Sequence, residues 1–476
     1  MGPRRILLLL AVLALFAVAC GDDSSTSTGS STEEVASTTT GGDMAEETPT
    51  TMAEETPTTM AADDMAEETS TTMAADAMPE MDHLGDGSLG TIVVEPGAEV
   101  QIRSLNAITG DTANFGLPIA RSIEIAVEDY GDVHGFGINL GDGLDDLCSA
   151  DGGQAAAQTI VADEQIAGVV GTSCSGAAVA AAPLISAAGI VMISGGNTSP
   201  ALTSDLAGTA GESFNEGYYR TAHNDLYQGR AMALFVFNDL GLSTAAAIHD
   251  GDPYTQGLAQ AFVDAYEELG GTITGFAGIA KGDTDMVPVL TEVAAANPEA
   301  LFFPIFQPEG DFIAAQAPGV PGLEDTQLLA ADGLLVKQYL ELPETEGIYF
   351  SGPDARFGEN VNESTGQSAN DVTAAYAADF GEEPTSPFWA HGYDATALLL
   401  DAIAAASAID GDGNLVIDKA GVREFLYGVQ NYSGLIGLIN CDDFGDCGSQ
   451  KVTVIHNDDS SDFDASKANV VFEYAP

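Results

Sequence analysis

Positively charged residues are scarce in this sequence of 476 residues. Lysine and arginine total 13, against 73 aspartates and glutamates, which gives a formal net charge of −60 at pH 7. Because such a charge repels phosphate groups, it argues against nucleic acid and anionic lipid headgroups as binding partners. The same balance favours solubility, and it carries no information about the fold.

Metal-ligand clusters and catalytic motifs are also missing. The six histidines are scattered without pairs at metal-ligand spacing, so we expect no metal site. Residues 171–175 (GTSCS) lack the final glycine of a nucleophile elbow, and no phosphate-binding loop occurs. The run 410–414 (DGDGN) is similar to a calcium loop, but Leu415 stands where glycine is required, so a solvated turn is the better interpretation. We therefore expect no enzymatic activity and no cofactor.

The N-terminus predicts export. Arg4 and Arg5 precede the apolar run 6–18, which is too short for a mature membrane-spanning helix but suits a secretion signal. The run ends in AVAC (17–20), which resembles the bacterial lipobox, whose cysteine is acylated and becomes the new N-terminus. We expect a signal peptide over 1–19, a lipid on Cys20 as the only membrane attachment, and a location at the cell surface or in the periplasm. The alternative is an ordinary signal peptide cleaved after Ala19, which also exports the protein.

Residues 20–89 predict a linker. Residues 21 to about 86 hold seventeen acidic and no basic residues, and the octamer MAEETPTT occurs twice and then as MAEETSTT. Such a polar sequence, rich in threonine and proline, has too little apolar surface to offset the chain entropy lost on folding. A coil of about 65 residues spans roughly 45 Å on average, enough to hold a folded domain away from a membrane.

From about Gly90 onwards, short apolar strands alternate with helices. This alternation is typical of parallel sheets covered by helices on both faces, in which ligands bind beyond the carboxyl ends of the strands. A chain of this length can bury more than one such core. We predict strands at 100–105, 137–140, 166–170, 191–194, 245–250, 272–277 and 300–306, and helices at 115–130, 153–163, 177–188 and 255–269.

The five cysteines leave an odd number in an exported protein. If Cys20 carries the lipid, four cysteines remain, and three pairings are possible. Cys441 and Cys447 enclose only five residues of an Asp/Gly-rich turn, so a local pair is favoured, and Cys148 is then left to pair with Cys174. Cys174 is therefore expected to be structural.

Four segments carry a specific family resemblance. They are IRSLNAITGDTANFG (102–116), SCSGAAVAAAPLISAAGIVMISGGNTSPALT (173–203), AIHDGDPYTQGLA (247–259) and FWAHGYDATALLL (388–400). With the Cys148/Cys174 pair, their order resembles the type I periplasmic binding proteins, and within them the leucine/isoleucine/valine-binding family that delivers amino acids and amides to ABC importers. The resemblance implies two Rossmann-like lobes joined by a three-crossover hinge. Lobe 1 would comprise 90–220 and 352–447, and lobe 2 would comprise 221–351 and 448–476.

The resemblance also implies a ligand site between the lobes. In lobe 1, Ser175 opens a helix, and Thr198 lies in a turn with Gly196 after the next strand. Their hydroxyls and the neighbouring backbone N–H groups suit a carboxylate, because the N-terminus of a helix attracts anions. Simple helix N-capping is the alternative role for Ser175 and Thr198.

The remaining candidate contacts come from both lobes. Tyr254 matches the aromatic residue that the family places over the ligand, and Asp332 stands where the family has an acid for the α-amino group. Phe306 replaces a tyrosine of the branched-chain binders, and Phe115 and Phe388 are the expected apolar contacts of a ligand side chain. The resemblance thus implies a monomeric solute-binding lipoprotein that passes a small, branched-chain-like amino acid to the permease subunits of an ABC importer. A sensor module, or a binder of amides, urea or aromatic acids, remains as an alternative.

Overall fold

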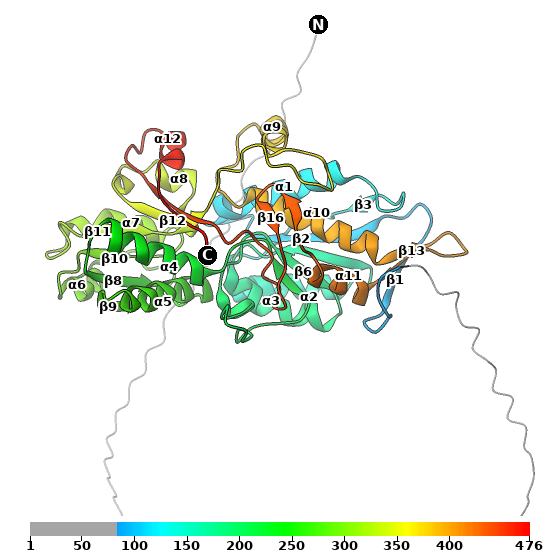
Figure 1. Ribbon diagram of the computed structural model, residues 1–476, viewed down its shortest axis with the longest axis horizontal. Helices are drawn as coiled ribbons and strands as arrows, with labels where there is room; N and C mark the ends of the chain where they lie inside the picture. The colour runs from blue at the N-terminus through cyan, green and yellow to red at the C-terminus, as the bar shows by residue number, and fades with distance from the viewer. Residues whose placement is uncertain (1–82) are drawn as a thin grey trace, which may run out of the picture. The chain divides into compact units, whose positions relative to one another are not determined.

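The computed structural model describes residues 83–476, and every element below belongs to this part of the chain (Figure 1). The predicted signal peptide, the acylation of Cys20 and the linker up to residue 82 lie outside the described residues. Among residues 83–476, none of the helices combines the length and the apolar character that crossing a membrane requires.

The first sheet has the strand order β3-β2-β5-β6-β7, with β4 also paired to β2, and all of its strands are parallel. Its central strand β5 is buried at all six positions, as expected for a strand covered on both faces. In Figure 1 the helices α1 and α10 lie on one side of this sheet, and α2 and α3 lie on the other. The strands are β2 (Val100–Asn106), β3 (Ile138–Asn139), β4 (Leu144–Asp145), β5 (Ile166–Gly171), β6 (Val191–Ser194) and β7 (Tyr218–Arg220). The helices are α1 (Ala113–Tyr130), α2 (Ala150–Val161), α3 (Ser175–Ala187) and α10 (Trp389–Ala405).

The second sheet has the order β18-β17-β12-β11-β10-β8-β9. Strands β8 to β12 pair in parallel, β17 adds antiparallel to β12, and β18 adds antiparallel to β17. The strands are β8 (Thr244–His249), β9 (Thr272–Gly278), β10 (Ala300–Phe302), β11 (Gln327–Ala330), β12 (Tyr349–Pro353), β17 (Val452–His456) and β18 (Val470–Tyr474). The helices are α4 (Asp225–Leu234), α5 (Pro253–Glu268), α6 (Val287–Ala294), α7 (Glu309–Gln316), α8 (Lys337–Leu340) and α12 (Phe463–Ala468).

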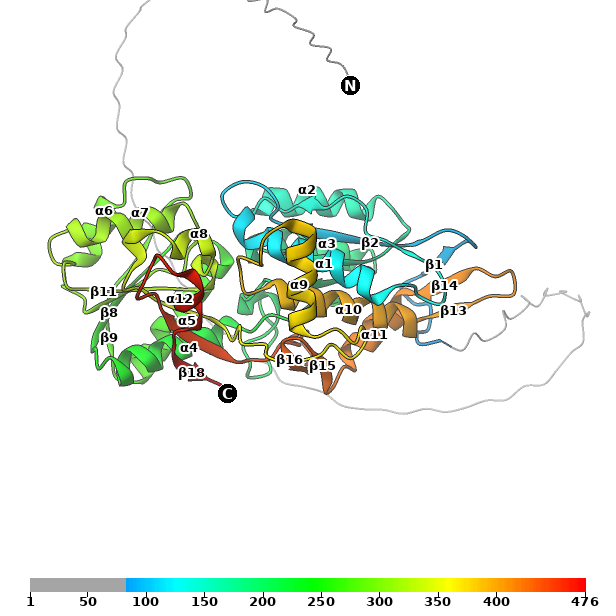
Figure 2. The same cartoon turned by 90° about the horizontal axis from the view of Figure 1, so that it is seen from above.

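We call the first sheet with its helices lobe 1 and the second sheet with its helices lobe 2; Figure 2 shows them side by side. The chain passes between the two sheets three times: from β7 to α4, from β12 to α9 (Ala369–Phe380), and from β16 (Gly437–Ile439) to β17. An α/β fold with two parallel-sheet cores was predicted, and it is confirmed.

One predicted strand is shorter in the structure, and one predicted turn lies between two strands. The predicted strand 300–306 ends at Phe302, because Pro304 has no N–H with which to continue the ladder. The run 410–414 forms the turn between β13 (Ser407–Ile409) and β14 (Leu415–Asp418), where Asp410 accepts hydrogen bonds from the N–H groups of Asp412 and Asn414. These two strands and β1 (Thr91–Val94) form a small antiparallel sheet, and α11 (Lys419–Tyr427) follows it.

Candidate ligand-binding site

The N-terminus of α3 lies at the carboxyl end of β5, where a parallel sheet binds its ligands. Ser175 is the first residue of this helix, and the N-cap is Cys174, so the capping role considered for Ser175 is wrong. The Ser175 hydroxyl instead accepts a hydrogen bond of 3.3 Å from the backbone N–H of Ser199. The first N–H groups of any helix lack partners inside the helix, so this end of α3 offers donors to an anion.

Thr198 lies in the loop that follows β6, the neighbouring strand. Its side chain is buried, and its carbonyl accepts a hydrogen bond of 3.0 Å from the backbone N–H of Asp225. Gly196 allows the loop to pack tightly, because a Cβ there would lie 3.0 Å from both Ile119 Cδ1 and the carbonyl oxygen of Ser173. The loop that carries Thr198 is thus held against α1 and against the residues just before α3.

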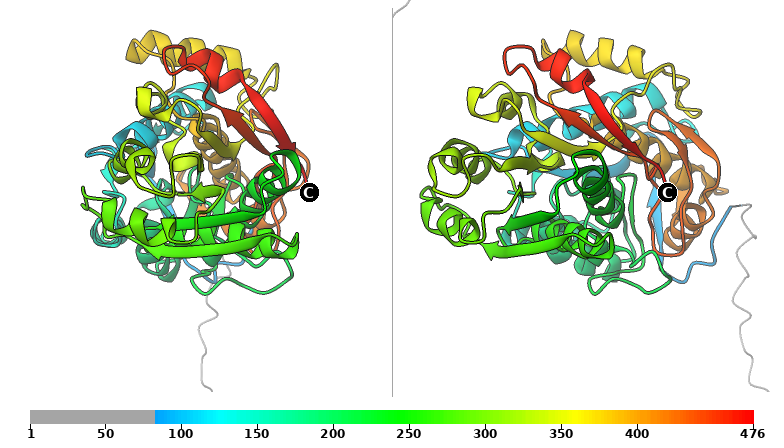
Figure 3. Two further views of the ribbon diagram at one scale, coloured as in Figure 1. Left: turned by 90° about the vertical axis from the view of Figure 1, so that its left-hand side faces the viewer. Right: turned by 60° about the vertical axis from the view of Figure 1, so that its left-hand side comes forward.

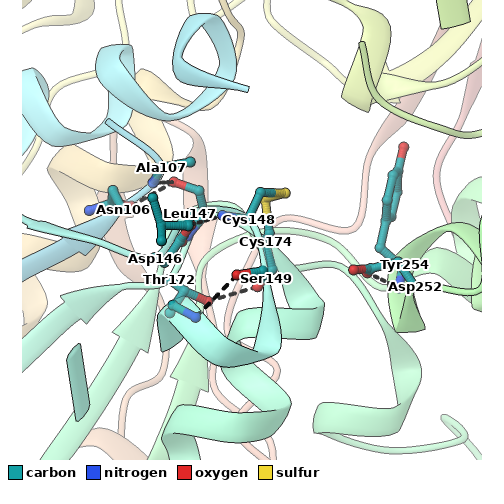
Figure 4. Close-up of a disulfide and its surroundings, with 12 residues drawn as sticks. Asn106, Ala107, Asp146, Leu147, Cys148, Ser149, Thr172, Cys174, Asp252 and Tyr254 are labelled. Carbon is teal, nitrogen blue, oxygen red and sulfur yellow. Dashed lines mark hydrogen bonds between the residues drawn. A yellow bond between two sulfur atoms is a disulfide. The ribbon is translucent and has the colours of Figure 1, made fainter. Parts of the chain in front are cut away.

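A disulfide fixes the start of α3 to the loop after β4. Cys148 and Cys174 are bonded, as predicted, and Figure 4 shows the bond facing Tyr254 and Asp252 across the site. Beside it, the buried Asp146 accepts hydrogen bonds of 2.7 Å from the backbone N–H groups of Cys148 and Ser173. Burial raises the pKa of the Asp146 carboxyl to about 7. The second predicted pair, Cys441–Cys447, is bonded as well.

In lobe 2, Asp332 and Tyr254 form a hydrogen-bonded pair. Asp332 follows β11 and is buried, and its Oδ1 accepts hydrogen bonds from the Tyr254 hydroxyl at 2.6 Å and from Gln228 Nε2 at 3.0 Å. The Tyr254 hydroxyl also accepts a hydrogen bond from the backbone N–H of Gly333 at 3.0 Å. Burial and the adjacent Asp332 raise the pKa of Tyr254 well above its usual range, so its hydroxyl stays a donor. Tyr254 therefore orients the carboxylate of Asp332.

Asp225 is a candidate site residue that could not be identified from the sequence. It lies in the first turn of α4, is completely buried, and within the described residues neither of its carboxyl oxygens has a hydrogen-bond partner. Burial and the negative charge of Asp332 raise the pKa of Asp225 well above its usual range. Asp225 thus connects the two halves of the site, because it adjoins Thr198 of lobe 1 and Asp332 of lobe 2.

Two further polar residues accompany Asp225. Gln228 donates to Asp332, and its carbonyl oxygen lies 2.5 Å from Nε2 of the buried His223. Burial lowers the pKa of His223, and it lowers the pKa of His391 to about 3, so both rings are neutral at pH 7. The buried Arg220 is paired with Asp446 at 2.5 Å. Within the described part of the chain, Asp225 and Asp332 therefore form no ion pair with a basic residue.

Aromatic rings from both lobes line the other side of the site. Phe115 on α1 contacts Phe306 of lobe 2 with ring centroids 5.6 Å apart, and it contacts Phe388 at 5.3 Å. Phe306 also contacts the ring of Tyr254 at 5.1 Å, and Phe388 stacks against His223 at 6.2 Å. These rings form a continuous apolar wall across the boundary between the lobes.

The lobes touch directly where α5 meets α3. Asp252, the N-cap of α5, lies so close to α3 that a Cβ at Gly176 would be 2.4 Å from Asp252 Oδ2. Lys281 Nζ lies 3.0 Å from the same carboxylate and donates to the carbonyl of Cys148 in lobe 1 at 3.4 Å. Ser199 also donates to the carbonyl of Pro253 at 3.0 Å. An acid of lobe 2, neutralised by a lysine, thus faces the helix end that we predict to bind a carboxylate.

The structure brings the eight predicted contact residues together in one buried region. Their contact with a ligand stays a prediction, whereas their mutual arrangement is now defined. They are Phe115, Ser175, Gly196, Thr198, Tyr254, Phe306, Asp332 and Phe388.

Comparisons with known proteins agree with this architecture. The model of the periplasmic binding protein family matches residues 99–455. Leu/Ile/Val-binding protein homolog 3 of Brucella melitensis is 27% identical over 370 residues, which cover 76% of this chain and 92% of that protein.

Solved structures show the same similarity. A leucine binding protein from Thermotoga maritima superposes with a TM-score of 0.67 at 26% sequence identity, and the match covers 79% of this chain and 99% of that one. A branched-chain amino acid transporter substrate binding protein from Streptococcus pneumoniae, in complex with isoleucine, gives a TM-score of 0.61 at 21% identity with the same coverage. At that lower identity the likeness concerns the fold alone.

Proposed function

This chain belongs to the periplasmic binding protein family, and on that premise we propose that it captures a small amino acid between its lobes and delivers it to an ABC importer. In this proposal the protein is an extracytoplasmic lipoprotein, held to the membrane by a lipid on Cys20, and works as a monomer. Its partners are the amino acid and the permease subunits of the importer.

The observation that carries the proposal is the pair of buried acids, Asp225 and Asp332, in a region that also contains the N-terminus of α3. Buried carboxylates without a cationic partner are costly, so a ligand that brings a positive charge is favoured there. An α-amino acid carries an ammonium and a carboxylate one carbon apart. The acids suit the ammonium, and Ser175, Thr198 and the free N–H groups of α3 suit the carboxylate.

The apolar wall supports an apolar side chain. Phe115, Phe306 and Phe388 present rings and no hydrogen-bonding groups, so they favour an aliphatic side chain over a polar one. The names of the similar proteins refer to leucine, isoleucine and valine, which have such side chains. We therefore propose a branched-chain-like amino acid as the ligand.

A neutral amide is the second candidate, and the raised pKa of Asp225 favours it. A protonated carboxyl group both donates and accepts a hydrogen bond, which matches the carbonyl and NH₂ groups of a primary amide. With Asp225 protonated, only one negative charge would remain to be balanced by a ligand.

A binding panel tests the two candidates. Leucine, isoleucine, valine, acetamide, urea and benzoate are added separately to the wild type and to Asp332→Asn, and binding is followed by thermal shift and calorimetry. Removal of a buried charged partner costs on the order of 2–5 kcal/mol, so Asp332→Asn should weaken an amino-acid ligand by well over tenfold and leave a neutral amide nearly unaffected.

The control variant is Asp394→Asn. Asp394 is a buried acid of α10 that accepts hydrogen bonds from Asn362, Leu435 and Ile436, and it does not adjoin the predicted contacts. This variant should lose stability and keep its affinity. A wild type that responds only to amides, or an unchanged amino-acid affinity in Asp332→Asn, would contradict the proposal. Ligand uptake by cells that have or lack the gene separates import from sensing.

A further inference from the structure

A cavity of about 410 Å³ lies next to the candidate site. Lobe 2 contributes Leu335 and Phe463 to its lining, the segment after β12 contributes Phe357, and lobe 1 contributes Trp389 and Thr373. Figure 3 shows the two helices that border it, α12 in red and α9 in yellow, at the same edge of the molecule. The cavity thus bridges the two lobes beside the second chain crossover.

Half of the lining residues are apolar or aromatic, and this half suits a flat apolar ring. Phe357 and Trp389 meet edge to face at 5.4 Å, and Phe463, Pro384 and Pro387 add further apolar surface. A volume of this size is typical of small-molecule sites, which are predominantly apolar and aromatic with a few polar groups.

Both basic residues of the cavity lining are already paired, and its two acids, Glu359 and Glu383, are exposed. The whole chain has 73 acidic and 13 basic residues, yet the cavity is lined by two of each. Arg356 is bonded to Asp354 and to Glu473, both at 2.7 Å, and Lys467 lies 3.3 Å from Asp464. The cavity therefore offers neither a free cation for an anionic ligand nor a deep acid for a cationic one.

From these observations we propose that the cavity is a second binding site, which takes a small neutral aromatic molecule packed against Trp389. The molecule would lie between α9 and α12 and contact both lobes in the arrangement seen here. No charged group on the ligand is required, because both cations of the lining are paired and both of its acids are exposed to solvent.

Two short segments connect this cavity to the candidate ligand site. Asp332 and Phe388 belong to the ligand site, whereas Leu335, three residues after Asp332, and Trp389, directly after Phe388, belong to the cavity. At the cavity edge, the backbone N–H of Lys337 in lobe 2 donates to the carbonyl of Thr385 at 3.0 Å.

A molecule in the cavity would stabilise the arrangement in which the lobes touch. By linkage, it would then raise the affinity of the candidate ligand site for its own ligand. This coupling rests on the proposed function, whereas binding to the cavity does not.

The fluorescence of Trp389 tests the binding, because it is the only tryptophan of the chain. The probe is 4-nitrobenzyl alcohol, a neutral aromatic molecule that quenches tryptophan. We expect saturable quenching, with half-saturation on the order of 1 mM for a ligand of this size. Quenching that rises linearly without saturation would overturn the proposal.

Two variants of α9 make this test specific. Thr373→Phe fills the cavity and should weaken the probe at least tenfold. Ala374→Phe places the same ring on the exposed face of α9, one residue further along the chain, and should leave probe binding unchanged. Equal quenching in Thr373→Phe and the wild type would show that the probe binds elsewhere, which would also overturn the proposal.

The coupling is measured separately. Leucine affinity of the wild type, measured by calorimetry, should rise about threefold in the presence of saturating probe, and an unchanged or lower affinity would refute the coupling. Asp332→Asn should still show saturable quenching by the probe, even though it is expected to lose its amino-acid ligand. A failure of the proposed function is thus distinguishable from a failure of the second site.

Discussion

Replacing Asp225 by asparagine should change stability and ligand affinity in opposite directions. The side chain is completely buried, and within the part of the chain that the structure describes its carboxyl oxygens have no hydrogen-bond partner. In the unliganded protein the buried acid therefore lowers the free energy of unfolding. In the proposed complex it becomes a partner of the ligand's ammonium group, so the same substitution removes an interaction.

The expected sizes follow from these two roles. Asp225→Asn removes the buried charge and keeps a buried polar amide; relief of the charge by about 1–3 kcal/mol at pH 8 should raise the melting temperature of the unliganded protein by roughly 1–4 °C. Losing a buried charge-assisted partner costs on the order of 2–5 kcal/mol, which corresponds to an affinity loss of about 30-fold or more.

The stability gain should also depend on pH, with a defined sign. Burial and Asp332 hold the folded-state pKa of Asp225 above its unfolded value. The stability that protonation of this group contributes is therefore fully present below about pH 4 and is lost as the pH rises through the folded-state pKa. The advantage of Asp225→Asn should accordingly be smallest near pH 4 and grow towards pH 8.

The assay compares the wild type and Asp225→Asn by urea unfolding between pH 4 and pH 8 without ligand, and by calorimetry with the amino acid found in the panel. A variant that is less stable than the wild type at pH 8 would show that the carboxylate is satisfied in the folded protein. An unchanged amino-acid affinity would show that Asp225 does not contact the ligand. Either result refutes the corresponding part of the reasoning.

Three further substitutions test other parts of the structure. Gly176→Ala places a methyl group 2.4 Å from Asp252 Oδ2, so the lobes should fail to reach this contact. Ligand affinity should then fall about tenfold. In the presence of ligand, small-angle scattering should show a larger radius of gyration for the variant than for the wild type. Serine in place of both Cys148 and Cys174 should lower the free energy of unfolding, measured in urea, by about 3–4 kcal/mol. Removing the Cys441–Cys447 disulfide, which closes a much shorter loop, should lower it by about 2 kcal/mol. Cys20→Ala should release the protein from the membrane fraction, and unchanged membrane retention would contradict lipid anchoring.

Part of the candidate site could be predicted from the sequence because its signals are local. Ser175 and Thr198 each follow a short apolar run, and parallel strands place such residues at the same sheet edge. Asp332 and Tyr254 were assigned by family resemblance, since nothing in their own segments distinguishes them. Their hydrogen bond joins residues 78 positions apart, and no sequence pattern reports it.

Asp225 shows why the rest could not be predicted. An acid in the first turn of a helix is ordinary, because the helix dipole favours it there. Lys281 presents the same difficulty: it is one of 13 basic residues, and only the folded chain brings it to the carbonyl of Cys148, 133 positions away. Both residues matter through surroundings that distant segments supply.

The sequence by itself determined the alternation of strands and helices, the family, and the pairing of the four cysteines of the folded part. It could do so because these features depend on residues that are close together along the chain: the apolar periodicity, the turn residues and the short loops that cysteine pairs close. Only the tertiary structure decided that Asp225 has no hydrogen-bond partner among residues 83–476, that Tyr254 holds Asp332, and that a cavity lies beside Trp389. Burial, desolvation and close contact depend on which distant segments of the chain contact one another, and these contacts form only when the two lobes pack.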